Sequence, residues 1–75
     1  MQWQLLKLRK EHNLSQEKMS KIARMSVVSY GKKERGEIQF SSDEMFSLKE
    51  YFGLPMEQIF LPRNFTQNEE KEVSN

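Results

Sequence analysis

The chain contains no cysteine, only two prolines, three glycines and one histidine among its 75 residues. Without cysteine it forms neither a disulfide framework nor a thiolate metal site, and one histidine does not supply a set of metal ligands. No apolar run approaches the roughly 18 residues that a membrane helix requires, and the N-terminal stretch MQWQLL is too short and polar for a signal peptide. These absences favour a small cytoplasmic protein that has no metal, cofactor or membrane partner.

Catalytic motifs are equally scarce. His12 stands at an expected helix end, where a histidine is more often a cap or a surface residue than a general base. The chain has no glycine-rich phosphate loop and no paired carboxylates in a plausible pocket. We therefore expect neither enzymatic activity nor a small-molecule ligand.

Charge is unevenly distributed along the chain, although the overall net charge is only +1. Residues 1–36 carry nine basic and three acidic side chains, a net charge of +6, whereas residues 37–75 carry three basic and eight acidic ones, a net charge of −5. A cluster of positive charge attracts polyanions and releases their counterions on binding. The alternative is that solvated helix faces collect such charges by chance.

Apolar spacing and capping residues predict five helices, and hence an all-α fold. Serines at positions 15, 26 and 41 are expected N-caps, and Ser41 with Glu44 has the spacing of a capping box. The expected domain covers residues 1–62, and the polar segment 63–75 is expected to be a flexible tail. The predicted helices run from about Gln2 to Glu11, from Gln16 to Ala23 and from Val27 to Arg35. A fourth helix follows the Ser41 cap and ends at Gly53, and a short fifth helix has Pro55 in its first turn and stops before Pro62.

The second and third predicted helices are joined by a tight turn at Arg24 and Met25. At 100° per residue, Val28 lies about 160° from Tyr30 around the third helix, so the two side chains cannot both face inward. We expect Tyr30 to be buried and Val28 to point outward. This arrangement suits a helix that is presented to the major groove of DNA.

Three segments, LRKEHNLSQE, YGKKERGE and SSDEMFSLKEYFGLPMEQIF, resemble the lambda-repressor-like (Xre/Cro-type) helix-turn-helix family in order and spacing. The resemblance covers about Leu5 to Phe60. It implies a compact five-helix DNA-binding domain in which helices two and three form the helix-turn-helix. Because the family comprises phage repressors and bacterial regulators, it also implies a bacterial protein that joins the nucleoid when it binds DNA.

The resemblance also implies which residues meet DNA. Lys32 would donate to guanine O6 or N7, whereas Val27 and Val28 can only pack against thymine methyl groups or exclude other base edges. Lys32, Lys33 and Arg35 could instead form a solvated, positively charged helix end that interacts favourably with the helix dipole. The implied base contacts are Val27, Val28, Ser29 and Lys32, and the implied phosphate contacts are Gln16, Ser26, Lys33 and Arg35.

Two further expectations concern the support of the third helix. The family pattern implies an ion pair between Arg9 and Glu34; the alternative is two independent surface charges. Arg24 stands where the family commonly has glycine, and left-handed geometry there costs on the order of 1 kcal/mol. Gly31 inside the third helix suggests close approach of either DNA or a neighbouring helix.

The expected function is a transcriptional regulator, most simply a repressor, that binds a palindromic double-stranded DNA operator as a homodimer. The alternative is a protein-binding adaptor or antirepressor of the same fold that modulates a larger repressor. The apolar residues of helix five could form the dimer surface, or they could equally pack within the chain's own core. The residues in question are Leu54, Met56, Ile59, Phe60 and Leu61.

Overall fold

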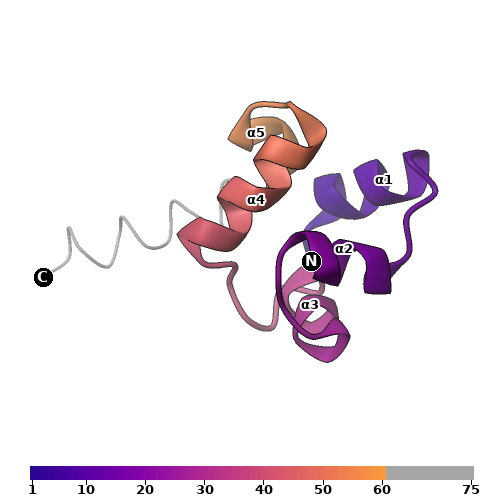
Figure 1. Cartoon of the computed structure of the whole chain (residues 1–75), viewed down its shortest axis with the longest axis vertical. Helices are drawn as coiled ribbons and strands as arrows, with labels where there is room; N and C mark the ends of the chain where they lie inside the picture. Colours follow the sequence, from indigo (N-terminus) through magenta and orange to yellow (C-terminus); the bar gives the residue numbers. More distant parts are fainter. Residues whose placement is uncertain (61–75) are drawn as a thin grey trace, which may run out of the picture.

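Five α-helices account for the regular structure of residues 1–60, which are the residues that the computed structural model describes. Leu61 and the expected tail, residues 63–75, lie outside them. Figure 1 shows α1 beside α5 and the pair α2 and α3 grouped together. The prediction of an all-α, five-helix domain is confirmed. The helices are α1 (Trp3–Glu11), α2 (Gln16–Ile22), α3 (Val27–Glu34), α4 (Ser42–Phe52) and α5 (Met56–Ile59).

Serine side chains begin three of these helices, as the sequence predicts. Ser15 and Ser26 each accept a hydrogen bond from the backbone N–H three residues later, at 3.0 and 3.1 Å. At α4, the Ser41 hydroxyl accepts from the Glu44 N–H at 3.2 Å, and the Glu44 carboxylate accepts from the Ser41 N–H at 2.8 Å. Each bond satisfies an amide that a helix start leaves without an internal partner, so local sequence alone sets these three boundaries.

The end of α3 is fixed by a Schellman motif. Gly36 adopts a left-handed conformation with φ of 86°. Its N–H donates to the carbonyl of Lys33 at 3.1 Å, and the N–H of Glu37 donates to the carbonyl of Lys32 at 2.9 Å. This pair of bonds defines the motif and holds the backbone of residues 36 and 37 against the last turn of α3.

All five helices contribute side chains to one core. Phe40, which comes from the connector between α3 and α4, has its ring centroid 5.9 Å from that of Tyr30 and 5.2 Å from that of Phe60. These contacts join the connector to α3 and to the end of α5. The buried apolar residues are Leu5, Leu8, Met19, Ala23, Tyr30, Phe40, Met45, Leu48, Ile59 and Phe60.

The short α5 corrects one prediction. Ile59 and Phe60 are 0% exposed because they pack into the chain's own core. These two residues therefore cannot form the expected dimer surface. Leu54 and Met56 are partly buried against the same core. Pro55 is the N-cap of α5 rather than a residue of its first turn, and Phe60 is extended, which leaves the helix one turn long.

Candidate nucleic-acid interface

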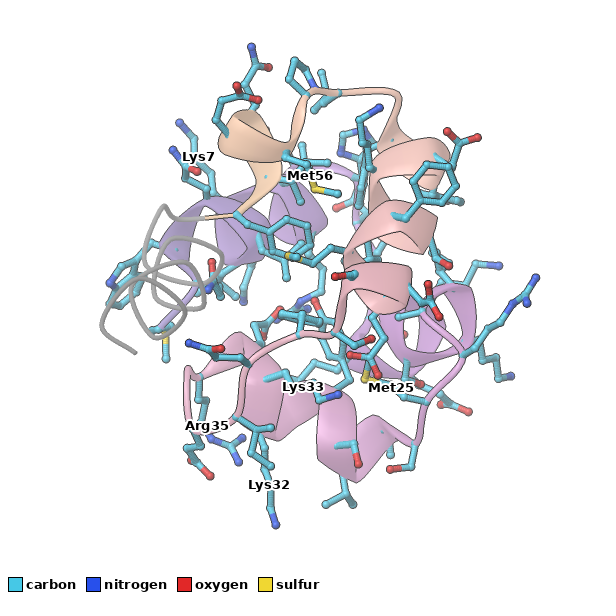
Figure 2. All side chains as sticks on the ribbon, turned by 90° about the vertical axis from the view of Figure 1, so that its left-hand side faces the viewer. Lys7, Met25, Lys32, Lys33, Arg35 and Met56 are labelled. Carbon is cyan, nitrogen blue, oxygen red and sulfur yellow. The ribbon has the colours of Figure 1, made fainter. Side chains whose placement is uncertain are left out.

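One side of α3 is open to solvent. The side chain of Val28 is 66% exposed and that of Val27 is 43% exposed, so the outward orientation predicted for Val28 is confirmed. Lys32 lies one turn further along the same helix, and Figure 2 shows its side chain extending away from the body of the protein. Ser29 is half-buried, and its backbone N–H is used in the cap of α3. The free side of α3 therefore presents two apolar side chains and one ammonium group.

The opposite side of α3 is buried around Glu34, which is 3% exposed. Its Oε2 accepts from Arg9 Nε at 2.8 Å and from the Tyr30 hydroxyl at 2.9 Å. Its Oε1 accepts from Gln16 Nε2 at 2.9 Å and from Arg9 Nη2 at 3.2 Å. One carboxylate thus joins α1, the start of α2 and two turns of α3, and the ion pair that the resemblance implies is present.

These bonds determine the electrostatics of the buried cluster. Burial by itself would raise the pKa of Glu34, but the hydrogen bonds from Arg9, Gln16 and Tyr30 outweigh it and hold that pKa below its usual value. Burial, together with the charge of Glu34, raises the pKa of Tyr30. At neutral pH the cluster therefore contains a charged Arg9, an ionised Glu34 and a neutral phenol.

A backbone hydrogen bond holds the N-terminal residues against the last turn of α3. The N–H of Gln2 donates to the carbonyl of Glu34 at 2.8 Å. Arg9 adds a bond from Nη1 to the carbonyl of Leu14 at 3.0 Å, which holds the loop before α2. The orientation of α3 is therefore fixed by α1 and by this loop as well as by α2.

Gln16 and Gly31 meet where α2 crosses α3. Gln16 uses one amide hydrogen for Glu34, which leaves the second for another acceptor such as a phosphate oxygen. A Cβ atom on Gly31 would lie 3.6 Å from Gln16 Oε1 and 3.2 Å from Arg35 Nη1. The close approach expected at Gly31 is thus an approach of neighbouring side chains.

Lys33 occupies a different position from the one that the resemblance implies. Its Nζ donates to both carboxylate oxygens of Glu44, at 2.7 and 2.8 Å, and its side chain is only 14% exposed. Burial opposes the charge on Glu44, but the bonds from Lys33 and Ser41 prevail and keep the pKa of Glu44 below its usual value. Lys33 connects α3 to α4 and has little surface left for a phosphate.

The remaining implied phosphate contacts lie at the two ends of α3. Ser26 is exposed at the helix start, where its hydroxyl caps the helix. Arg35 is the C-cap residue, and its Nε donates to Glu37 Oε2 at 2.8 Å while both side chains remain about half exposed. Glu37 was not among the site residues predicted from the sequence, although it directly follows Gly36, where the predicted third helix ends.

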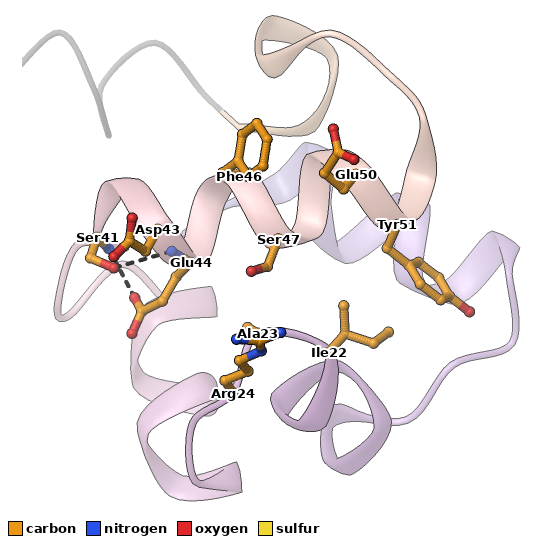
Figure 3. A pocket seen from close by; sticks show the side chains of 10 residues that line it. All are labelled: Ile22, Ala23, Arg24, Ser41, Asp43, Glu44, Phe46, Ser47, Glu50 and Tyr51. Atoms are coloured by element: carbon orange, nitrogen blue, oxygen red, sulfur yellow. Dashed lines mark hydrogen bonds between the residues drawn. The ribbon is translucent and has the colours of Figure 1, made fainter.

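Arg24 lies in the turn between α2 and α3 and faces α4. It has a φ of 62°, so the turn keeps the left-handed geometry that a glycine at this position would adopt without strain. With Ile22 and Ala23 it forms one wall of a groove whose other wall is α4, as Figure 3 shows. Among residues 1–60, no group of acidic, histidine or cysteine side chains could hold a metal ion, and no helix is long and apolar enough to cross a membrane.

Comparison with known proteins agrees with this geometry. A family model described as helix-turn-helix matches residues 5–59, which is more than half of the chain and includes every helix from α2 to α5. Neither the curated proteins nor the solved structures contain a significant match to the chain. With α2 and α3 packed together as the motif requires, this chain belongs to the lambda-repressor-like, Xre-type helix-turn-helix family of DNA-binding regulators.

Proposed function

We propose that this chain is a sequence-specific transcriptional repressor that inserts α3 into the major groove of an operator. The observation that carries the proposal is the division of α3 into two sides. Val28 and Lys32 stand free on one side, while the other side is fixed through Glu34 to Arg9 and Gln16. A helix held in one orientation can repeat the same base contacts at every encounter.

In this proposal the exposed residues of α3 contact the base edges in the major groove. Lys32 is the side chain on this side that can donate to guanine, and Val27 and Val28 favour bases whose edges carry a methyl group and penalise those that need a hydrogen-bond partner. Half-buried Ser29 lies beside them and can approach the groove wall. A site that contains both guanine and thymine is therefore the expected preference.

Side chains around α3 contact the DNA phosphates in this proposal. Gln16 retains one free amide hydrogen, and Arg35 has a planar fork of donors that suits a phosphate oxygen pair. Ser26 can add a hydroxyl at the start of the helix. The net charge of +6 on residues 1–36 supports electrostatic attraction of the DNA backbone to this half of the chain.

Occupancy of two half-sites by a homodimer is the simplest way for so small a domain to obtain affinity and specificity. One α3 covers a single half-site, and a two-fold symmetric pair reads a palindrome. Ile59 and Phe60 are buried in the chain's own core, so a surface that joins two copies would use other side chains, such as the partly buried Leu54 and Met56. A regulator of this kind represses by occupying DNA that the transcription machinery needs.

The test begins with selection of duplexes from a random library, followed by affinity measurements on the selected site. Val28→Asp places a carboxylate opposite the bases, and Lys32→Glu reverses a charge facing DNA; each should weaken binding at least tenfold. Lys7→Glu is the matched control, since Lys7 is exposed on α1 and lies far from Lys32 in Figure 2. It makes the same charge change and should have a much smaller effect.

The same selection reports symmetry and salt dependence. A homodimer should return an inverted repeat with half-sites about one helical turn apart, and its affinity should fall steeply as salt rises. The proposal is wrong if Val28→Asp and Lys32→Glu bind the selected duplex as Lys7→Glu does. Salt-insensitive association with a protein instead of DNA would indicate an adaptor.

A further inference from the structure

We propose that Glu37 is an internal competitor for DNA phosphate, whose carboxylate occupies the Arg35 guanidinium until a correctly placed phosphate displaces it. The inference rests on the proposed function and concerns the regulation of the same interface. Its structural basis is the bond of 2.8 Å between Arg35 Nε and Glu37 Oε2, formed at the end of α3 and on the surface.

The position of Glu37 is fixed by backbone geometry. Its N–H donates to the carbonyl of Lys32 at 2.9 Å as part of the Schellman motif, and the preceding Gly36 takes the left-handed φ of 86° that the motif requires. The backbone of Glu37 is therefore held next to the last turn of α3. From this backbone position its carboxylate is within hydrogen-bond reach of the Arg35 guanidinium.

The carboxylate lies among the cations that the interface uses. The hydrogen bond from Arg35 and the charges of Arg35 and Lys32 hold the pKa of Glu37 below its usual value, which places both cations within electrostatic range of it. Figure 2 shows Arg35 and Lys32 at the same end of α3. In the free protein, Glu37 thus removes one unit of positive charge from the place where a DNA strand would approach.

Comparison with the two shielded ion pairs that hold α3 shows why this one can exchange. Arg9–Glu34 and Lys33–Glu44 are largely shielded from water, with side-chain exposures between 4% and 19%, whereas Arg35 and Glu37 are 47% and 52% exposed. An exposed pair contributes little stability, because water and salt compete with it. Glu37 accepts one bond from the guanidinium, to Oε2, whereas a well-placed phosphate can accept two and therefore replace it.

The consequence is a lower affinity for DNA that is bound in the wrong register. Non-specific binding depends almost entirely on phosphate contacts, and in a loosely docked complex a phosphate near Arg35 can contact a free guanidinium but is not placed well enough to displace Glu37. A complex seated by α3 has one in place. Glu37 would thereby increase the ratio of specific to non-specific affinity.

Glu37→Gln tests the inference, because it keeps the shape of the side chain and removes its charge. At low salt the variant should bind non-specific duplex several-fold more tightly than the wild type, with a smaller gain on the selected site. The slope of log affinity against log salt should steepen by about 0.9 for non-specific duplex, the amount for one additional phosphate. Glu57→Gln removes the same charge from exposed Glu57 on α5 and should change neither quantity appreciably.

A double variant separates a local exchange from general repulsion. If Glu37 acts through Arg35, then Glu37→Gln should have almost no effect once Arg35→Gln is present. If Glu37 merely repels DNA, the gain should persist in the Arg35→Gln background, and the inference is wrong. It is also wrong if Glu37→Gln and Glu57→Gln give equal affinities and slopes.

A probe without DNA distinguishes failure of this inference from failure of the proposed function. In NMR titrations with inorganic phosphate, the Arg35 Nε–Hε signal should shift at lower phosphate concentration in Glu37→Gln than in the wild type. If no duplex binds the wild type while this difference is seen, the proposed function is wrong but the competition at Arg35 stands. Equal titrations in the two proteins would overturn the competition itself.

Discussion

At the scale of single residues, backbone conformation accounts for two unusual positions. Asn13 and Arg24 have φ values of 55° and 62°, and each lies in the turn that follows a helix. Asparagine tolerates this left-handed region, whereas arginine gains nothing from it. The tight turn between α2 and α3 is therefore kept at a local cost that a glycine would not incur.

We expect Arg24→Gly to raise the free energy of unfolding by about 1 kcal/mol, because glycine removes the left-handed penalty. Urea denaturation at pH 7 measures the change. Gly53→Ala provides the opposite case, since Gly53 has a φ of 67° and nothing lies within 4 Å of an added Cβ. It should lower the free energy by a similar amount through backbone strain alone. Equal signs for the two substitutions would contradict this explanation.

Sequence predicted single residues well wherever a local rule applied. The direction of Val28 followed from the angle between neighbouring helix positions, and the three serine caps followed from their spacing. The partner of Lys33 was not predictable in the same way, because Glu44 lies eleven residues away and reaches Lys33 only because the fold brings the first turn of α4 near the last turn of α3. Arg35 and Glu37 are close in sequence, but their bond depends on the exact helix end.

At the scale of helices, α1, α2 and α3 are tied together by the carboxylate of Glu34. Arg9 and Gln16 reach it from the first two helices, and Tyr30 reaches it from one turn earlier in α3. A buried carboxylate that loses its cation is strongly destabilising, even where the intact pair adds little net stability. We therefore expect the pair to matter more for the orientation of α3 than for net stability.

A double-mutant cycle on Arg9 and Glu34 tests this role. Arg9→Ala should lower the free energy of unfolding by about 3 kcal/mol, since it leaves an unpaired charge in the core. Arg9→Ala combined with Glu34→Gln should cost clearly less than the sum of the two single variants. Additive costs would mean that the two side chains act independently. Unchanged melting temperature and unchanged operator affinity in Arg9→Ala would also refute the proposed role.

The existence of the five helices could be predicted from caps and apolar spacing, but the use of α5 could not. Its apolar residues were compatible with a dimer surface or with the core, because periodicity shows which side of a helix is apolar and not what covers it. Contacts among Tyr30, Phe40 and Phe60 decide the matter. They depend on a connector residue that lies in no helix.

At the scale of the whole molecule, ion pairs cross between the basic and the acidic half of the chain. Lys33 belongs to the half with net charge +6 and Glu44 to the half with net charge −5. Glu34 and Glu44 both have a lowered pKa in the folded protein. Each is thus more acidic when folded than when unfolded, so both contribute stability above the unfolded pKa of about 4.5.

We therefore expect the free energy of unfolding to be constant near neutral pH and to fall as pH drops below about 5, through the lowered pKa values of the folded carboxyls. Urea denaturation at several pH values measures it. Glu44→Gln keeps a side-chain acceptor for the Ser41 N–H but removes the charge, so it should lower stability at pH 7 by about 1 kcal/mol. Its decline with acid should be shallower. A parallel decline in both proteins would contradict the assignment.

The hydrogen bond from the Gln2 N–H to the Glu34 carbonyl has a practical consequence for handling the protein. It brings the start of the polypeptide to the last turn of α3, so a purification tag fused ahead of Met1 would emerge beside the helix that we propose enters DNA. Such a tag could mask the operator-facing surface or, if rich in histidine or lysine, add phosphate contacts of its own. Affinity measurements should use protein from which any N-terminal fusion has been cleaved.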